Sequence, residues 1–113
     1  MTSKFYRGAL ILVALGALGS VPMLNAEPSP AGNVTDAINE AKQAVDHGRQ
    51  GEAEALATHA EKSVEYAEMG AKNRHLVEGI KHLKEAIEHG KAGHAEEATT
   101  HAETGLAHLT EAE

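Results

Sequence analysis

The chain has 113 residues, enough for one small domain, and its formal net charge at pH 7 is −7. This negative charge argues against nucleic acid as a partner and favours cations. The chain contains no cysteine, which excludes disulfide bonds and thiolate metal sites. Eight histidines stand out, and all of them follow Ala26.

The first 26 residues have the pattern of a secretory signal peptide. Two bases, Lys4 and Arg7, precede an apolar run over 8–21 that is short for a membrane span. The small residue Ala26 supplies a cleavage position. We therefore expect a signal peptide over 1–26 and export to the periplasm, after which the formal charge becomes more negative because two bases are lost. The alternative is an uncleaved N-terminal anchor.

Residues 27–32, EPSPAG, are expected to form a short flexible leader. The remaining residues, 33–113, contain no proline and few β-branched residues, which favours helix. Asn33 and Asp36 resemble a capping box at the first helix start. Glycine-containing breaks at 47–51, 70–74 and 89–93 divide this part into four helices, at about 33–47, 52–69, 75–89 and 94–111.

Apolar side chains recur in steps of three and four residues, which marks one face of a helix. They are Val34, Ile38, Ala41 and Val45 in the first helix, and Leu76, Ile80, Leu83 and Ile87 in the third. Because the links are short, consecutive helices should run antiparallel. The sequence predicts an all-α fold, an antiparallel up-down four-helix bundle over 33–113. Its core should be thin and rich in alanine, with Met69 inside it and Tyr66 packing against it.

The chain also contains an internal repeat at an offset of 42 residues. Residues 44–61, AVDHGRQGEAEALATHAE, align with residues 86–103, AIEHGKAGHAEEATTHAE. An offset of 42 is six heptads, so the helical phase is preserved. The bundle is therefore expected to consist of two repeated helical hairpins.

The histidines of the second hairpin are spaced by seven. They are His75, His82 and His89 on the third helix, and His94, His101 and His108 on the fourth. A step of seven turns the side chain by only about 20° and climbs roughly 10.5 Å, so each set forms a line down one helix face. Within a line the histidines are too far apart to share an ion.

Two sources could supply the missing ligands. The first is the same helix, where a carboxylate three positions after a histidine, or four before it, can join in chelation. Glu78, Glu85, Glu97 and Glu111 follow a histidine by three, and the first three of them also precede one by four.

The second source is the neighbouring helix, because residues at equal height in an antiparallel hairpin have a constant sum of residue numbers. That sum is 183 for His89 with His94, His82 with His101, and His75 with His108. In the first hairpin it is 99 for His47 with Glu52, Glu40 with His59, and Asn33 with Tyr66. Whether both histidine lines face one groove depends on the handedness of the bundle, which the sequence leaves open.

These patterns predict a set of metal ligands. They are His47, His59, His75, His82, His89, His94, His101 and His108, together with Glu78, Glu85 and Glu97. Imidazole with carboxylate suits borderline divalent ions. Affinity normally peaks at Cu(II), and Ni(II) and Zn(II) also suit this donor set.

Two motifs of the second hairpin, GIKHLKEAIEHG (79–90) and HGKAGHAEEATTHAE (89–103), resemble the small metal-binding protein family of bacterial periplasms. The resemblance covers 33–112 and includes a signal peptide upstream. It implies a monomeric four-helix bundle that binds several divalent ions, notably Cu(II), and serves in copper sequestration. The first hairpin is a weaker match, because Glu40 and Glu52 stand where the second hairpin has His82 and His94.

We therefore expect a periplasmic protein that buffers Cu(II) and also accepts Ni(II) and Zn(II), without stable membrane association after signal cleavage. No catalytic residues are expected: a catalytic zinc needs three converging ligands and a dry cavity, and a ferritin-like di-iron site needs Glu-x-x-His, which the chain lacks. The alternative is a metal-independent helical interaction protein or pH sensor, since imidazole titrates near a pH of about 6.5.

Overall fold

Four α-helices make up the described part of the chain, which in this computed structural model is residues 30–113, with side chains from Asn33 onward. They are α2 (Pro30–Arg49), α3 (Ala53–Glu68), α4 (Arg74–Lys91) and α5 (Ala95–Ala112). The expected all-α fold is confirmed. None of these described helices has the length and apolarity needed to cross a membrane. The expected signal peptide, 1–26, lies outside the described residues.

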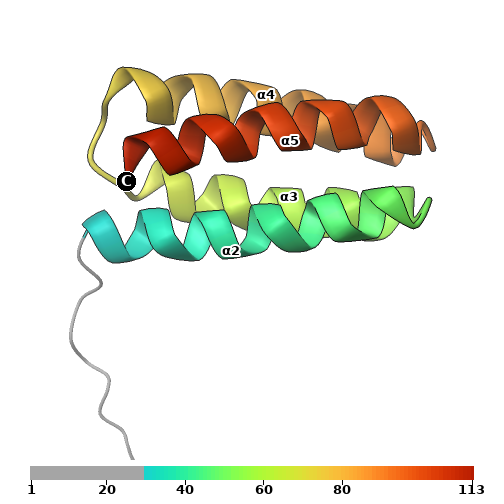
Figure 1. The fold of residues 1–113 in the computed structure, drawn as a ribbon, viewed down its shortest axis with the longest axis horizontal. Helices are drawn as coiled ribbons and strands as arrows, with labels where there is room; N and C mark the ends of the chain where they lie inside the picture. Colours follow the sequence, from blue (N-terminus) through green and yellow to red (C-terminus); the bar gives the residue numbers. More distant parts are fainter. Residues whose placement is uncertain (1–29) are drawn as a thin grey trace, which may run out of the picture.

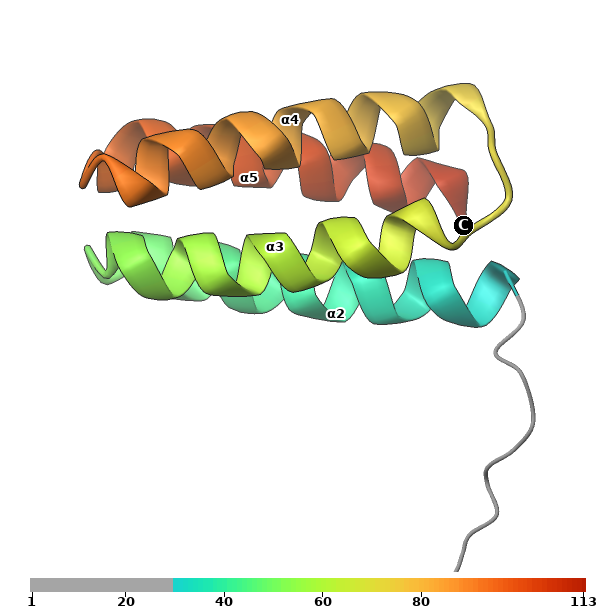
Figure 2. The same cartoon turned by 180° about the vertical axis from the view of Figure 1, so that it is seen from behind.

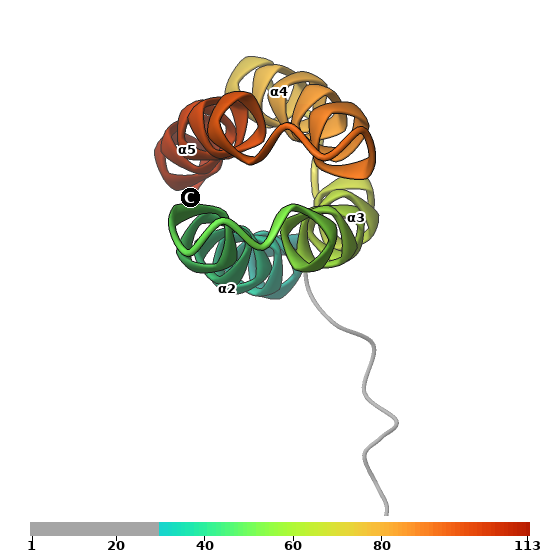
Figure 3. The same ribbon diagram turned by 90° about the vertical axis from the view of Figure 1, so that its right-hand side faces the viewer.

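The helices form two antiparallel hairpins that pack against each other as a four-helix bundle (Figure 1). Helices α2 and α3 make one hairpin, and α4 and α5 make the other, as the view from behind also shows (Figure 2). Seen end-on, α3 lies beside α4 and α5 lies beside α2 (Figure 3). The start of α2 lies beside the end of α5, where Thr35 Oγ1 donates a hydrogen bond of 2.9 Å to the Glu113 carboxylate.

Helix α2 begins three residues before the expected position, at Pro30. Proline is well tolerated in the first turn of a helix, because the N–H it lacks would have no partner there. Asn33 therefore lies inside the helix, and the expected capping box with Asp36 is wrong. The buried Asn33 side chain instead donates from Nδ2 to the Met69 carbonyl at 3.4 Å, which links the start of α2 to the end of α3.

The two hairpin turns have the same backbone geometry. Each contains a glycine in the left-handed region, Gly51 with φ 80° and Gly93 with φ 83°, where a side chain would be strained. In each turn a backbone N–H reaches back five residues: Glu52 donates to the His47 carbonyl at 2.9 Å, and His94 donates to the His89 carbonyl at 2.8 Å. Each turn therefore brings together two of the positions that the sum rule pairs.

The buried face of each helix is the one that the apolar spacing predicts. In α2, all four expected residues are buried, and in α4 Leu76 and Leu83 are buried while Ile80 and Ile87 pack partly buried against them. Alanine supplies more of the described core than any other residue. The expectation for Met69 is wrong: α3 ends at Glu68, and the Met69 side chain is 53% exposed in the turn that follows.

Glycines inside α4 and α5 allow these two helices to approach each other closely. A Cβ atom added to Gly79 would lie 3.2 Å from the Gly105 carbonyl oxygen and 2.9 Å from Leu109 Cδ2. A Cβ on Gly105 would lie 3.1 Å from the Gly79 carbonyl oxygen. In the first hairpin, Ala37 aligns with Gly79 and Ser63 aligns with Gly105. There the Ser63 Oγ donates a hydrogen bond of 2.7 Å to the Ala37 carbonyl. The close approach in the second hairpin brings its two histidine lines together.

Candidate metal centre

Six histidines form a continuous ladder along the groove between α4 and α5. In order along the groove they are His94, His89, His101, His82, His108 and His75. Consecutive ring centroids are 5.9, 5.3, 5.8, 5.7 and 5.9 Å apart. Beyond the turn, consecutive rings come from opposite helices. We call this set the histidine ladder.

The ladder contains the three pairs whose residue numbers sum to 183, and it adds contacts that the sum rule does not predict. His89 lies 5.3 Å from His101, and His82 lies 5.7 Å from His108, as close as the pairs at equal height. Both histidine lines therefore face the same groove, and the expected separate levels merge into one row.

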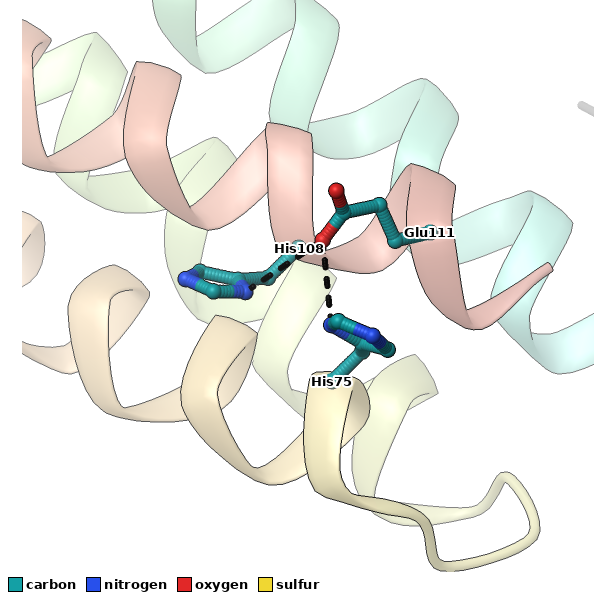
Figure 4. A group of neighbouring side chains, drawn as sticks. All are labelled: His75, His108 and Glu111. Atoms are coloured by element: carbon teal, nitrogen blue, oxygen red, sulfur yellow. Dashed lines mark ion pairs between the residues drawn. The ribbon is translucent and has the colours of Figure 1, made fainter.

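One group of potential ligands lies at the open end of the α4–α5 hairpin. His75 at the start of α4, and His108 and Glu111 at the end of α5, have ligand atoms that all lie within 4.8 Å of one another. Glu111 Oε1 lies 3.0 Å from His75 Nδ1 and 3.8 Å from His108 Nδ1. The carboxylate thus lies between two imidazoles from different helices (Figure 4).

A second group lies nearer the middle of the groove and repeats this arrangement. The Oε1 atom of Glu85 lies 3.3 Å from Nδ1 of His82, which is three residues earlier in α4, and 3.2 Å from Nδ1 of His101 in α5. The ligand atoms of these three residues also lie within 4.8 Å of one another. Each of these two groups therefore contains two imidazoles and one carboxylate.

A third group lies between the other two and borrows one histidine from each. It consists of Glu78, His82 and His108, all partly buried, again with ligand atoms within 4.8 Å of one another. The Nδ1 atoms of His82 and His108 are buried and make no hydrogen bond with the described residues. Each of these nitrogens lies near a carboxylate of another group, His82 Nδ1 at 3.3 Å from Glu85 Oε1 and His108 Nδ1 at 3.8 Å from Glu111 Oε1, and each is available as a donor to an ion.

The donor sets fit a borderline divalent cation. Two atoms that coordinate one ion through bonds of about 2.0–2.2 Å lie at most about 4 Å apart. A separation within 4.8 Å therefore requires only small side-chain movements to close around an ion. Ligation by imidazole nitrogen and carboxylate oxygen is typical of zinc, nickel and copper sites.

Some of the expected ligands lie outside the three groups. His89 and His94 continue the ladder, but no carboxylate of the described residues joins them in a group, and His94 is exposed at the start of α5. Glu97 is exposed and belongs to none of the groups. Conversely, Glu111 belongs to a group although it was not in the expected set. Its spacing of three from His108 was the available signal.

The first hairpin holds its histidines differently. His47 Nδ1 lies 2.5 Å from Glu52 Oε1, and His59 Nδ1 lies 2.9 Å from Glu40 Oε1. These are two of the three pairs whose residue numbers sum to 99. The two imidazole rings are stacked with centroids 5.0 Å apart. Within the described residues, however, no group of three ligands forms in this hairpin.

Comparison with known proteins agrees with this geometry. A search of the curated proteins finds no match for the chain. The family model described as "Small metal-binding protein" matches residues 5–112. This match spans nearly the whole chain, and the chain therefore belongs to the small metal-binding protein family.

Proposed function

We propose that the protein is a periplasmic buffer for Cu(II), which also accepts Ni(II) and Zn(II) and binds them mainly along the histidine ladder. The observation that carries the proposal is the set of three His/Glu groups between α4 and α5, with two buried imidazole nitrogens that make no hydrogen bond within residues 33–113. Membership of a small metal-binding protein family supports the same conclusion.

The donor set supports copper as the preferred ion. Each group offers two imidazole nitrogens and one carboxylate oxygen. For sites of this type, affinity among first-row divalent ions normally rises to Cu(II) and falls again at Zn(II). The partial exposure of the ligand side chains favours uptake and release over permanent structural binding.

The arrangement favours binding over catalysis. A cavity of about 300 Å³ lies between the end of α3 and the start of α4, and its walls include Ala67, Leu76, Val77 and Ile80 but no histidine. None of the three ligand groups opens into it. Catalytic metal sites normally combine converging ligands with a dry, shaped cavity, whereas the ladder histidines are all exposed or only partly buried.

The periplasmic location rests on the first 26 residues and is part of the proposal, together with a monomeric mature protein. If the leader is removed during export, protein recovered from a periplasmic fraction should have the intact mass of a chain starting at Glu27. Recovery of the full-length chain from the inner membrane would contradict this location.

Isothermal titration calorimetry tests the proposed function directly. The mature protein should bind several Cu(II) ions, with Ni(II) and Zn(II) competing for them less tightly. Binding of no ion in stoichiometric amount would favour the alternative of a helical interaction or pH-sensing protein, since neither role requires metal.

A further inference from the structure

The three ligand groups of the histidine ladder overlap. His108 belongs both to the group with Glu111 and to the group with Glu78. His82 belongs both to the group with Glu78 and to the group with Glu85. We call the group of Glu78, His82 and His108 the central group, and the other two the outer groups. The outer groups share no residue with each other.

A shared histidine can serve only one ion at a time. A neutral imidazole has one nitrogen with a free lone pair, because its other ring nitrogen carries a proton. When His82 coordinates an ion in the central group, it cannot also complete the outer group with Glu85 and His101. His108 likewise cannot complete the outer group with His75 and Glu111. One central ion therefore blocks both outer groups.

Building on the proposed function, we propose that the groove holds its metal in two mutually exclusive arrangements: one ion in the central group, or two ions in the outer groups. The central group is supported by its own geometry: the ligand atoms of its two histidines and of Glu78 lie within 4.8 Å of one another, and all three side chains are partly buried. Glu78 is also available, since it forms no ion pair with the described residues.

Unlike Glu78, the carboxylates of the outer groups already contact histidines. Glu85 lies within 3.3 Å of both of its histidines, and Glu111 lies 3.0 Å from His75. Because adjacent groups share a histidine, an ion can move from an outer group to the central group without releasing that shared ligand. Loading a second ion displaces the first from the centre, and losing one allows the other to return.

The test is an ion count in variants that remove the unshared histidines. His75 belongs only to one outer group and His101 only to the other. Native mass spectrometry of the Cu(II)-loaded mature protein, in excess glycine to strip ions held by one or two ligands, gives the count. His75→Ala and His101→Ala should each lose one ion, because the remaining two groups share a histidine and hold one ion between them.

The double variant is decisive. With both outer groups removed, the central group remains intact, so His75→Ala/His101→Ala should still lose only one ion relative to the unmodified protein. Adding Glu78→Gln should then remove a second ion, whereas adding Glu88→Gln, an exposed residue of α4 outside every group, should remove none. Helical content from circular dichroism should be unchanged, because alanine is a strong helix former.

Other counts would overturn the proposal. A double variant that loses two ions would show that the two outer sites are independent and that no central site exists. A double variant that loses none would show that the outer groups are not sites. Neither result would affect the proposed function as long as the unmodified protein takes up Cu(II). If the unmodified protein takes up none, the proposed function itself fails.

Discussion

Single carboxylates connect the two helices of the ladder. Glu85 Oε1 lies 3.3 Å from a histidine of its own helix, His82, and 3.2 Å from His101 of the neighbouring helix. Glu111 makes the equivalent pair of contacts from α5. An acid at this position balances part of the charge of a bound cation, and it supplies the third donor of each outer group.

The first prediction concerns Glu85→Gln, which keeps the shape of the side chain but removes its charge. We expect the affinity for one Cu(II) ion to fall about tenfold or more, because ligands and their close supports contribute on this scale. Competition titration against a chelator measures the loss. The matched control is Glu96→Gln, an exposed residue of α5 outside every group, for which the affinity should not change.

At this scale the sequence predicts contacts along one helix and the cross-helix pairs at equal height, but it misses cross-helix contacts between different heights. Spacing places Glu85 beside His82, and the structure agrees. The contact between Glu111 and His75 depends on how α4 and α5 pack, which no local spacing specifies. Glu97 has the same local spacing to His94 as Glu85 has to His82, yet it lies exposed and joins no ligand group among the described residues.

Pairs of helices determine how wide the groove is. The close approach of α4 and α5 at Gly79 and Gly105 leaves no room for a side chain on either glycine. A glycine inside a helix costs about 1 kcal/mol of helix stability relative to alanine. The two glycines therefore weaken their own helices and in return allow histidines from both helices to reach one ion.

The second prediction is that Gly79→Ala widens the groove. The added Cβ gains about 1 kcal/mol of helix propensity but overpacks the interface, which typically costs about 1–3 kcal/mol, so a net loss of about 1 kcal/mol is expected in urea unfolding. The affinity for Cu(II) should fall about tenfold, as when the support behind metal ligands is lost.

The control for this variant is Ala37→Gly, at the aligned position of the first hairpin. It should cost about 1 kcal/mol of stability through helix propensity and about 0.8 kcal/mol more through loss of the buried methyl group, without changing the α4–α5 groove. An equal loss of affinity in both variants would mean that lower stability, and not groove width, explains the effect of Gly79→Ala.

The sequence predicts the arrangement of the helices more completely than it predicts which histidines meet between α4 and α5. Helix spacing and glycine breaks predict four antiparallel helices and the buried faces of α2 and α4, all of which are observed. Heptad spacing fixes the angle of a side chain around its own helix only. The groove that a histidine faces depends on how the two hairpins pack together. The single row of six histidines could therefore not be predicted from heptad spacing alone.

The whole molecule combines a thin core with a surplus of acids. Small alanines dominate the described core, and the full chain carries a formal charge of −7. Small cores supply little stability, and self-repulsion among like charges reduces it further. Bound divalent ions oppose both effects, because they neutralise charge and hold two helices together.

The third prediction is that metal stabilises the fold. An ion present at 100 times its dissociation constant adds about 2.7 kcal/mol per independent site, which raises the Tm of a domain of this size by on the order of 10 °C. The Tm of the mature protein should therefore rise on adding Cu(II) at pH 7.5.

The rise should be much smaller at pH 5. Coordination requires neutral imidazole, and free imidazole has a pKa of about 6.5, so protons displace the ion as the pH falls. The stabilisation is thus present above this pH and lost below it. Equal rises of the Tm at both pH values would contradict imidazole coordination.

Two ion pairs between the hairpins follow the same 42-residue offset as the sequence repeat. Arg49 at the end of α2 pairs with Glu103 of α5 at 2.7 Å, and Lys91 at the end of α4 pairs with Glu61 of α3 at 2.8 Å. In these two ion pairs, each hairpin supplies the base from the end of its first helix and the acid from its second helix. A hairpin of this kind could pair with a second copy of itself as a two-fold symmetric dimer.

Joining two such hairpins in one chain makes their encounter intramolecular, with an effective concentration on the order of millimolar. The two copies are then free to diverge, one towards acid–imidazole pairs and the other towards a continuous row of imidazoles.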